Sequence, residues 1–351
     1  GISFEADILA NSYIDLNPSY DESQNAYPIR ISVKEGTDMT SLAPIFELTP
    51  GATISPASGS VQNFTTPVRY TVTSEDKAWH RVYAITAREQ KASNIPTTYH
   101  FEKVRIMQNV WQEFYEEQDS GNELTWASGN KGFKWAMSEA ATEDYPTTQI
   151  DNGKTGKCVK LETRLTGDLG NMVGMPIAAG NLFIGSFDML NAITNPLSAT
   201  RFGTPFYNKP LRLTGYYKYK AGEQFYENGE YTSRKDIFNI YAIFYDGVKY
   251  DSAGKGTDVT LDGNLPNQNY EHSSMVALAL VSNPQETEGD EWKFFDIPFD
   301  YQRYGKKIDE ARLAKGEYKI GIIFASSKDG ATFEGAPGST LLIDEVELIY
   351  E

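Results

Sequence analysis

Cysteine, histidine and long apolar runs are scarce in this sequence, and each shortage excludes a class of protein. The single cysteine, Cys158, excludes an internal disulfide, a zinc cluster and a CxxC redox pair. No apolar run approaches the ~20 residues that a membrane-spanning helix needs. The three histidines, His80, His100 and His272, have no nucleophile motif beside them, so a serine-hydrolase triad is not indicated. A net charge of −16 without any run of basic residues excludes a nucleic-acid partner.

Aromatic residues are abundant instead, with 22 Tyr, 18 Phe and 5 Trp making 13% of the chain. Tyr and Phe favour the half-buried surface of strands, which accounts for much of the excess. Exposed rings also stack on the faces of sugars, so some of the excess is available for binding. Both interpretations stay open here.

The first ninety residues contain short alternating segments at 29–33, 68–73 and 81–86, separated by turns rich in Gly, Pro and Asp. This spacing predicts a small β-sandwich domain over residues 1–90. Residues 91–98 are polar, lack periodicity and contain Pro96, which is typical of a linker.

From residue 99 to 351, strand patterns recur between Gly-rich turns, and they end with an apolar strand at 340–350. Helical patterns are few: 308–315 favours a short helix, and 104–117 is ambiguous. Many strands without alternating helices predict a larger antiparallel jelly-roll β-sandwich. The long connection at 250–271 is either a lobe covering a ligand, a second cation site, or a surface loop.

The N-terminal part contains three characteristic phrases, at residues 49–59, 63–67 and 70–76. They resemble the immunoglobulin-like modules that begin Bacteroidetes surface lipoproteins. This resemblance implies a spacer domain on an exported protein, held by a lipid anchor at the outer-membrane surface or located in the periplasm. The chain begins at Gly1 without an initiator Met, and we expect a signal or lipid-attachment segment to have preceded it.

The larger part contains further characteristic phrases, at residues 126–132, 179–185, 202–206, 213–219, 292–299, 324–330, 333–336 and 338–346. Together they resemble the putative carbohydrate metabolism domain of Bacteroidetes outer-surface proteins. The resemblance implies a polysaccharide or oligosaccharide as partner, together with other surface proteins of glycan utilisation.

Sugar-binding residues are expected where rings reach solvent. Alternation along 211–219 puts Arg212, Tyr216 and Lys218 on the polar face of one strand. Trp126 and Trp135 flank a polar, Gly-containing stretch and are predicted to rim a cleft, although a tryptophan there also suits the end of a sandwich core.

A structural calcium is predicted from a likeness to jelly-roll carbohydrate-binding modules, in which the first and last strands are adjacent. Glu102 near the start of the module and Asp344 in its last strand would supply hard oxygen ligands. The alternative is that both are ordinary polar residues on outer strands.

No sequence spacing identifies a catalytic pair of carboxylates among the 48 acidic residues. Asp246, Asp296 and Glu334 are the candidates, because they lie near strand ends within the family phrases. Three hypotheses therefore remain: a non-catalytic surface glycan-binding module, a glycoside hydrolase of undescribed type, and a structural or adhesive surface protein.

Overall fold

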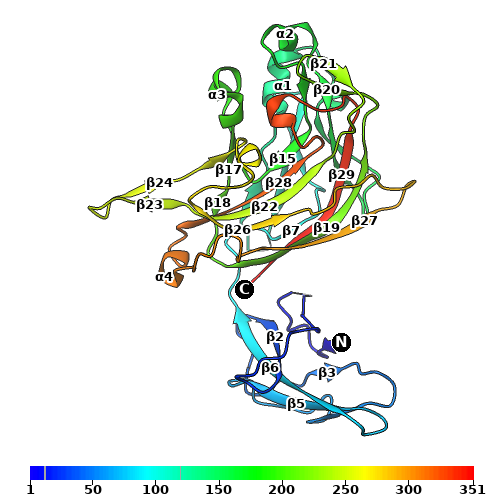
Figure 1. Ribbon diagram of the computed structural model, residues 1–351, viewed down its shortest axis with the longest axis vertical. Helices are drawn as coiled ribbons and strands as arrows, with labels where there is room; N and C mark the ends of the chain where they lie inside the picture. Colours follow the sequence, from blue (N-terminus) through cyan, green and yellow to red (C-terminus); the bar gives the residue numbers. More distant parts are fainter. Residues whose placement is uncertain (12, 119) are drawn as a thin grey trace. The chain divides into compact units, whose positions relative to one another are not determined.

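The computed structural model describes residues 1–11, 13–118 and 120–351, which form two compact units (Figure 1). The first unit comprises Gly1–Ala92 with the terminal Glu351, and the second comprises Ser93–Tyr350. The division falls inside the segment 91–98 that was expected to be a linker. Most of that segment packs with the second unit, because Ile95 is only 6% exposed and Asn94 Nδ2 donates to the Pro205 carbonyl at 2.9 Å.

The first unit is built on one four-stranded sheet in the order β2-β6-β5-β4, with β2 and β6 parallel. Alternate residues Ile29, Ile31 and Val33 of β2 are buried, as the period-two pattern predicts. Its likeness to the immunoglobulin fold remains a prediction. The strands are β2 (Tyr27–Lys34), β4 (Thr53–Ser55), β5 (Val68–Thr73) and β6 (His80–Gln90), with a separate pair β1 (Ile2–Ser3) and β3 (Ile45–Phe46).

The second unit is an antiparallel β-sandwich of two main sheets, which confirms the predicted all-β class. The six-stranded sheet has the order β11-β12-β29-β19-β27, and β7 also pairs with β29. The five-stranded sheet has the order β15-β28-β22-β26, and β18 also pairs with β28. Their bounds are β7 (Thr98–Tyr99), β11 (Thr147–Ile150), β12 (Cys158–Glu162), β15 (Asn181–Phe183), β18 (Thr204–Pro205), β19 (Pro210–Lys220), β22 (Asn239–Asp246), β26 (Met275–Leu280), β27 (Lys293–Pro298), β28 (Tyr318–Ala325) and β29 (Thr340–Tyr350).

The two ends of the second unit pair with each other, as predicted from the closing strand. Tyr99 in β7 lies opposite Val346 in β29, and Thr98 lies opposite Glu347. This pairing completes the six-stranded sheet from both ends of the unit's sequence, so an intact sheet requires both ends of the unit.

The main core lies between the two sheets and contains Trp126, which is 1% exposed. Its ring centroid is 5.0 Å from that of Tyr99, 5.7 Å from that of Phe101 and 5.9 Å from that of Phe324. The expectation that Trp126 rims a ligand cleft is therefore wrong. Its amide donates to Phe114 at 2.9 Å and extends the strand pairing, which directs the indole into the core.

The five-stranded sheet is covered on its second face as well. A lobe formed by β16, β17, β25 and η3 packs Phe202, Leu261 and Leu265 against that face. Residues 239–245 of β22 are consequently all buried, which is typical of a strand enclosed on both sides. The lobe's elements are β16 (Gly185–Phe187), β17 (Thr200–Phe202), β25 (Leu261–Asp262) and η3 (Pro266–Gln268).

The long connection at 250–271 thus contributes β25 and η3 to a packed layer, and begins with a hairpin of β23 (Val248–Tyr250) and β24 (Gly256–Asp258).

The ambiguous segment 104–117 forms two strands, and the predicted helix at 308–315 is a single turn. None of the helices in the described part of the chain is long and apolar enough to span a membrane. The remaining elements are β8 (Val104–Met107), β9 (Trp111–Glu117), β10 (Glu123–Thr125), α1 (Asn130–Ala136), η1 (Thr142–Asp144), β13 (Arg164–Leu165), α2 (Gly167–Met172), β14 (Ile177–Ala178), α3 (Met189–Thr194), η2 (Pro196–Ser198), β20 (Phe225–Glu227), β21 (Glu230–Thr232), α4 (Glu310–Leu313) and η4 (Gly330–Thr332).

We predict that Trp126→Ala lowers the free energy of unfolding by about 3–5 kcal/mol, because it leaves a cavity among packed rings. Trp126→Phe should cost clearly less, since it keeps a ring in place and removes a buried indole N–H that has no hydrogen-bond partner in the described structure. Denaturant unfolding of both variants measures this. Equal losses for Ala and Phe would contradict the assignment of Trp126 to the core.

Candidate ligand-binding cleft

A cleft opens at one end of the five-stranded sheet and is lined by residues of α1 and α3, two helices that lie near the top of Figure 1. Its floor comes from β15, β22 and β28, and its walls come from α1, α3 and the segments around η2 and η4. The enclosed volume is about 170 Å³. An engineered apolar cavity of about 150 Å³ holds one benzene molecule, so this cleft has room for one six-membered ring.

Hydrogen bonds fix the start of α1 over the sheet. The buried Asn130 donates from Nδ2 to the Thr147 carbonyl at 2.7 Å, and its Oδ1 accepts from the Thr147 amide at 3.1 Å. Next to it, the Gly129 amide donates to Asn181 Oδ1 at 2.7 Å. These bonds tie the helix to β11 and β15, so this wall of the cleft is held in place before any ligand arrives.

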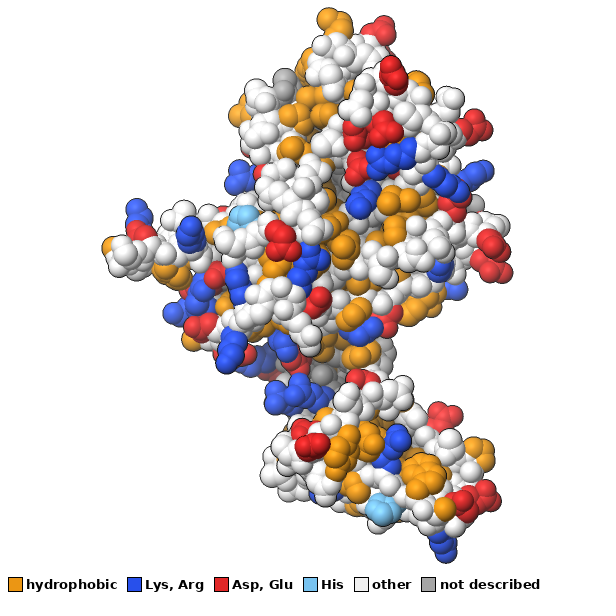
Figure 2. Space-filling view, in the orientation of Figure 1, with side chains coloured by type: hydrophobic (Ala, Val, Ile, Leu, Met, Phe, Trp, Pro, Cys, Tyr) orange, Lys and Arg blue, Asp and Glu red, His pale blue; other side chains and the backbone are white. Residues whose placement is uncertain are grey.

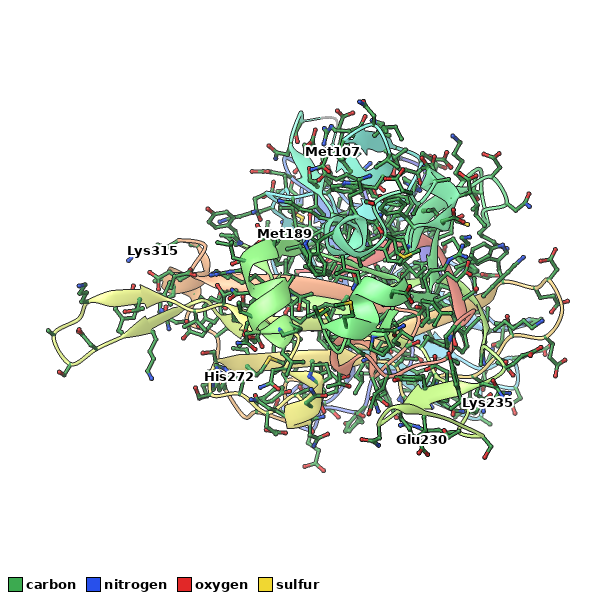
Figure 3. All side chains as sticks on the ribbon, turned by 90° about the horizontal axis from the view of Figure 1, so that it is seen from above. Met107, Met189, Glu230, Lys235, His272 and Lys315 are labelled. Carbon is green, nitrogen blue, oxygen red and sulfur yellow. The ribbon has the colours of Figure 1, made fainter. Side chains whose placement is uncertain are left out.

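The opposite wall begins at α3. Asp188 caps this short helix: its carboxylate accepts from the amide of Leu190 at 2.9 Å and from that of Asn191 at 3.4 Å. In the view from above (Figure 3), Met189 lies at the start of α3 beside the central helices. Met189 and Ala192 line the cleft.

The cleft surface is mainly apolar, with aromatic rings contributed by Phe133, Phe183 and Phe202. A few polar groups interrupt it. Asn239 donates from Nδ2 to the Tyr270 hydroxyl at 2.9 Å, and Thr200 Oγ1 is buried without a hydrogen-bond partner in the described structure. Rings with a few convergent polar groups are typical of small-ligand sites.

Trp135 lines this cleft and is 37% exposed. It comes from the last turn of α1, so one side of its ring is available to a ligand. Apolar side chains also gather at this end of the unit (Figure 2), where Leu169 and Met172 of α2 are exposed. Of the two tryptophans predicted from the sequence, this one lies at the cleft.

Arg212, Tyr216 and Lys218 lie elsewhere, on the outer face of the six-stranded sheet. Arg212 Nε is 2.6 Å from Asp296 Oδ1, and Lys218 Nζ is 2.7 Å from Asp290 Oδ1. The cross-strand partner of Tyr216 is Phe294, which is 53% exposed, with ring centroids 5.2 Å apart. The Trp292 ring centroid lies 5.1 Å from Lys218 Nζ. These side chains form a second surface, here called the outer sheet face.

Sequence reasoning missed several residues of both surfaces. Phe294 alternates with buried Phe295 along β27, so period-two alternation indicated its exposure, whereas Trp292 precedes the strand and is partly buried. Asn239 is a polar residue at the start of β22, whose central residues 240–245 are apolar or aromatic, and this is a signal for a specific polar role. The rings from β16 and β17 had no such signal, because the sequence does not reveal which segment covers the sheet.

The three acidic residues proposed for catalysis lie in separate places. Asn239 at the cleft and Asp246 occupy opposite ends of β22, and a strand of that length spans about 23 Å. Asp296 lies on the other sheet and pairs with Arg212. Glu334 follows Phe333 of the cleft wall, and its amide donates to the Asp329 carbonyl at 3.3 Å. These three residues therefore do not form a carboxylate pair at the cleft.

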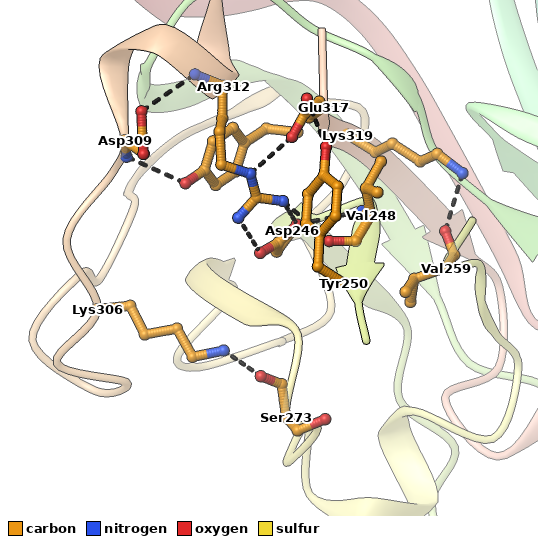
Figure 4. Close-up of polar contacts among 11 residues, drawn as sticks. Asp246, Val248, Tyr250, Val259, Ser273, Lys306, Asp309, Arg312, Glu317 and Lys319 are labelled. Carbon is orange, nitrogen blue, oxygen red and sulfur yellow. Dashed lines mark hydrogen bonds and ion pairs between the residues drawn. The ribbon is translucent and has the colours of Figure 1, made fainter. Parts of the chain in front are cut away.

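Asp246 belongs to an ion-pair cluster around Arg312 (Figure 4). Arg312 donates to both Asp246 oxygens at 2.7 and 2.5 Å, to Glu317 Oε2 at 2.6 Å and to the Val248 carbonyl at 2.8 Å. These bonds raise the pKa of Arg312, and the Arg312 guanidinium lowers the pKa of Glu317. Tyr250 completes the cluster by donating to Glu317 Oε1 at 2.9 Å.

His272 is exposed, and its Nδ1 accepts from the Ser274 amide at 3.1 Å. Figure 3 labels it apart from Met189, and it does not line the cleft. The structure therefore gives His272 no part in the site.

A buried carboxylate, Asp236, stands behind the cleft wall. Its Oδ2 accepts from Ser327 Oγ at 2.5 Å, from Ser339 Oγ at 2.7 Å and from the Ala336 amide at 2.8 Å. Burial raises the pKa of Asp236, while these bonds act in the opposite direction. Ser327 itself lines the cleft, so Asp236 holds the wall in position.

Glu102 and Asp344, the predicted calcium ligands, both bind the turn between β11 and β12. Asp344 Oδ2 accepts from the Thr155 amide at 3.0 Å, and Glu102 Oε1 accepts from the Lys157 amide at 2.7 Å. A Cβ at Gly153 would lie 2.8 Å from Asp344 Oδ2, so the turn needs glycine there. No group of three or more His, Cys, Asp or Glu residues suited to a metal occurs among the described residues. The calcium site remains a prediction.

The fold and the cleft define the second unit as an antiparallel β-sandwich with a mainly apolar cleft at one end. Two families match the chain: one described as a putative carbohydrate metabolism domain, over residues 100–349, and one described as the N-terminal domain of SGBP, over residues 15–87. The first match covers more than half of the chain, so the protein belongs to the putative carbohydrate metabolism domain family. The SGBP match indicates a relationship to surface glycan-binding proteins.

Two solved structures are similar to the chain. A putative glycoside hydrolase from Bacteroides thetaiotaomicron is 46% identical, with a TM-score of 0.66, over 93% of this chain and 91% of that one. A putative glycoside hydrolase from Bacteroides vulgatus is 50% identical, with a TM-score of 0.68, over 74% of this chain and 100% of that one. No curated protein matches the chain.

We predict that Asp246→Asn lowers the free energy of unfolding by about 1–3 kcal/mol, because it breaks a partly buried, two-pronged ion pair with Arg312. The matched control is Asp258→Asn. The Asp258 side chain is 66% exposed and pairs with Lys319, so its loss should change the free energy of unfolding by less than about 1 kcal/mol. Denaturant unfolding compares the two. Equal effects would contradict a structural role for Asp246.

We also predict a pH dependence from Asp344, which is fully buried and whose pKa is raised by burial to about 6. A carboxyl whose pKa is higher in the folded state favours folding while protonated, and this contribution is lost as pH rises from about 4 to about 6. The stability of the wild type relative to Asp344→Asn should therefore fall over that range, by up to about 3 kcal/mol. Unfolding curves measured at several pH values test this, and a constant difference would contradict it.

The same variant tests the calcium prediction. A cation bound at Asp344 requires its carboxylate, so added Ca²⁺ should raise the Tm of the wild type and leave that of Asp344→Asn unchanged. A wild-type Tm that does not respond to Ca²⁺ or to a chelator would refute the site.

Proposed function

We propose that this protein is a non-catalytic cell-surface module that binds a glycan, with the cleft at Trp135 as its binding site. The observation that carries the proposal is the cleft itself: a preformed cavity of one-ring size with a half-exposed indole at its edge. The two family matches, one to carbohydrate metabolism and one to SGBP, point to the same ligand class. We further propose that the protein is exported and lipid-anchored at the outer-membrane surface.

A sugar ring suits this cleft for two reasons. The C–H face of a sugar packs against aromatic rings, which Trp135 and the phenylalanines of the wall supply. Its hydroxyl groups need partners once they leave water, and Asn181, Asn239 and Thr200 bring amide and hydroxyl groups to the same cavity. Because the cavity holds only one ring, it suits a terminal unit of a glycan better than the middle of a chain.

A glycoside hydrolase is the second candidate, and the names of both solved relatives favour it. Hydrolysis requires two carboxylates about 5–10 Å apart on either side of the bond that is cleaved. Asp246 and Asp296 are held in ion pairs away from the cleft. Incubation of the protein with any glycan that it binds, followed by product analysis, separates the candidates: new reducing ends would establish hydrolysis.

The outer sheet face is proposed as an additional glycan contact. Tyr216 and Phe294 present rings, and Arg212 and Lys218 present cations already paired with Asp296 and Asp290. Charges paired in this way make the surface close to neutral. An adhesive role would instead use an unpaired sheet edge such as β27, and would appear as self-assembly of the protein.

We predict that Trp135→Ala weakens binding to the glycan found by array screening at least tenfold, or about 1.4 kcal/mol, because it removes the stacking ring. The matched control is Trp79→Ala, which removes another exposed tryptophan (54%, against 37% for Trp135) from the first unit and should leave the affinity unchanged. Calorimetry measures both variants. Tyr216→Ala and Phe294→Ala, compared in the same way, test the outer sheet face.

Unchanged affinity in Trp135→Ala would refute the cleft as the binding site. The absence of binding to any plant or host glycan on the array would refute the proposed function as a whole. Preserved unfolding transitions in both tryptophan variants establish that lost binding reflects the site.

A further inference from the structure

A second depression, here called the α1 groove, adjoins the cleft along α1, because Phe133 and Ala136 line both. Its volume is about 690 Å³, against about 170 Å³ for the cleft. The groove is formed by the end of α1 and the turn after it, by β13 and the end of β12, and by the segment that precedes β29. Its size falls in the range of about 300–1,000 Å³ that is typical of ligand sites.

The cleft and the α1 groove share a partition. Phe133 and Ala136 of α1 line both of them. In the β13–β14 ribbon, Arg164 lies in the groove and its cross-strand partner Ala178 lies in the cleft. Behind these residues, Thr163 Oγ1 of the groove wall is 2.5 Å from Ser327 Oγ of the cleft wall.

The two depressions therefore adjoin at α1. Ala136 has a side chain of one methyl group and is partly exposed, so it forms a low rim common to both depressions. Phe133, in contrast, is 4% exposed and fills the partition below the rim. A chain with one unit in each depression would therefore pass over Ala136 at the rim of α1.

The lining of the α1 groove differs from that of the cleft. It carries three carboxylates, on Glu139, Asp144 and Glu162, and one guanidinium, on Arg164. Glu162 Oε2 is bonded to Lys160 Nζ at 3.0 Å and lies 3.2 Å from Arg164 Nη2. Three negative charges and one positive charge line the groove, and Lys160, which pairs with Glu162, adds a second positive charge, so the net charge is −1.

We propose that the α1 groove is the extended subsite for the same glycan, and that it selects uncharged chains. This inference rests on the proposed function: one terminal ring occupies the cleft, and the following units lie in the groove. Carboxylate and guanidinium groups hydrogen-bond to sugar hydroxyls there. The excess negative charge repels uronate or sulfate groups, most strongly at low ionic strength.

The test uses the full chain and neutral gluco-, manno- and xylo-oligosaccharides of one to six units, with oligogalacturonates of equal length. The groove variant is Glu139→Ala combined with Arg164→Ala. Its matched control is Glu143→Ala, which removes an exposed acid from η1 that does not line the groove. Calorimetry gives the Kd of each protein for each length, and thermal unfolding shows that each variant is folded.

For the wild type and the Glu143→Ala control, we expect affinity to rise at least tenfold between one unit and four. The groove variant should bind the single unit unchanged and lose most of that gain, whereas Trp135→Ala should weaken binding at every length. Oligogalacturonates should bind at least tenfold more weakly than neutral chains at low salt, with a smaller difference at high salt.

Affinity that is independent of length, or a groove variant that keeps the full gain, overturns the extended subsite and leaves the proposed function standing. Uronate chains that bind as tightly as neutral chains overturn the charge selection. If the wild type binds none of these oligosaccharides, the proposed function fails together with this inference.

Discussion

The second unit depends on the burial of the five-stranded sheet on both of its faces. One face packs against the six-stranded sheet through Ile240, Ala242 and Phe244, and the other needs a separate cover because Tyr241 and Ile243 are also apolar. Exposing such a face would leave a large apolar patch in water. The segments at 185–202 and 256–272 supply this cover, and the cleft lies where the cover ends and α1 begins. The cleft is thus a consequence of how the sheet is enclosed.

Local patterns in the sequence were sufficient for the class of fold, and the likeness to jelly-roll modules, in which the first and last strands are adjacent, predicted the pairing of the second unit's ends. Alternation identifies strands because successive side chains point to opposite faces, and the apolar closing strand β29 had to find partners in a sheet. The same patterns were not sufficient for the helices of the cleft. The helices α1, α2 and α3 each have seven residues or fewer, and α2 begins and ends with Gly167 and Met172 in a stretch without amphipathic period. Such short helices are stabilised by tertiary contacts, as with Asn130, and not by local propensity.

The candidate site shows the same division between local and tertiary information. Trp126 and Trp135 are nine residues apart in one polar stretch, and nothing local distinguishes them. Trp126 continues a strand pairing with β9 and enters the core, whereas Trp135 lies in the last turn of α1 and reaches the cleft. The roles of the acidic residues were likewise not predictable from local sequence. The sequence shows Asp246 and Asp296, but their roles depend on Arg312 and Arg212, which approach from other strands and loops.

The partition between the cleft and the α1 groove is supported by one buried polar cluster. The buried Asp236 binds Ser327 and Ser339, and Ser327 in turn meets Thr163, so one polar cluster supports walls of both depressions. Buried polar groups of this kind are tolerated only when each is hydrogen-bonded, and here the carboxylate accepts from two hydroxyls and from backbone amides. Loss of the Asp236 carboxylate would therefore disturb both depressions at once. A cleft and a groove held by one cluster keep a fixed spacing, which a chain of linked sugar rings needs in order to occupy both without distortion.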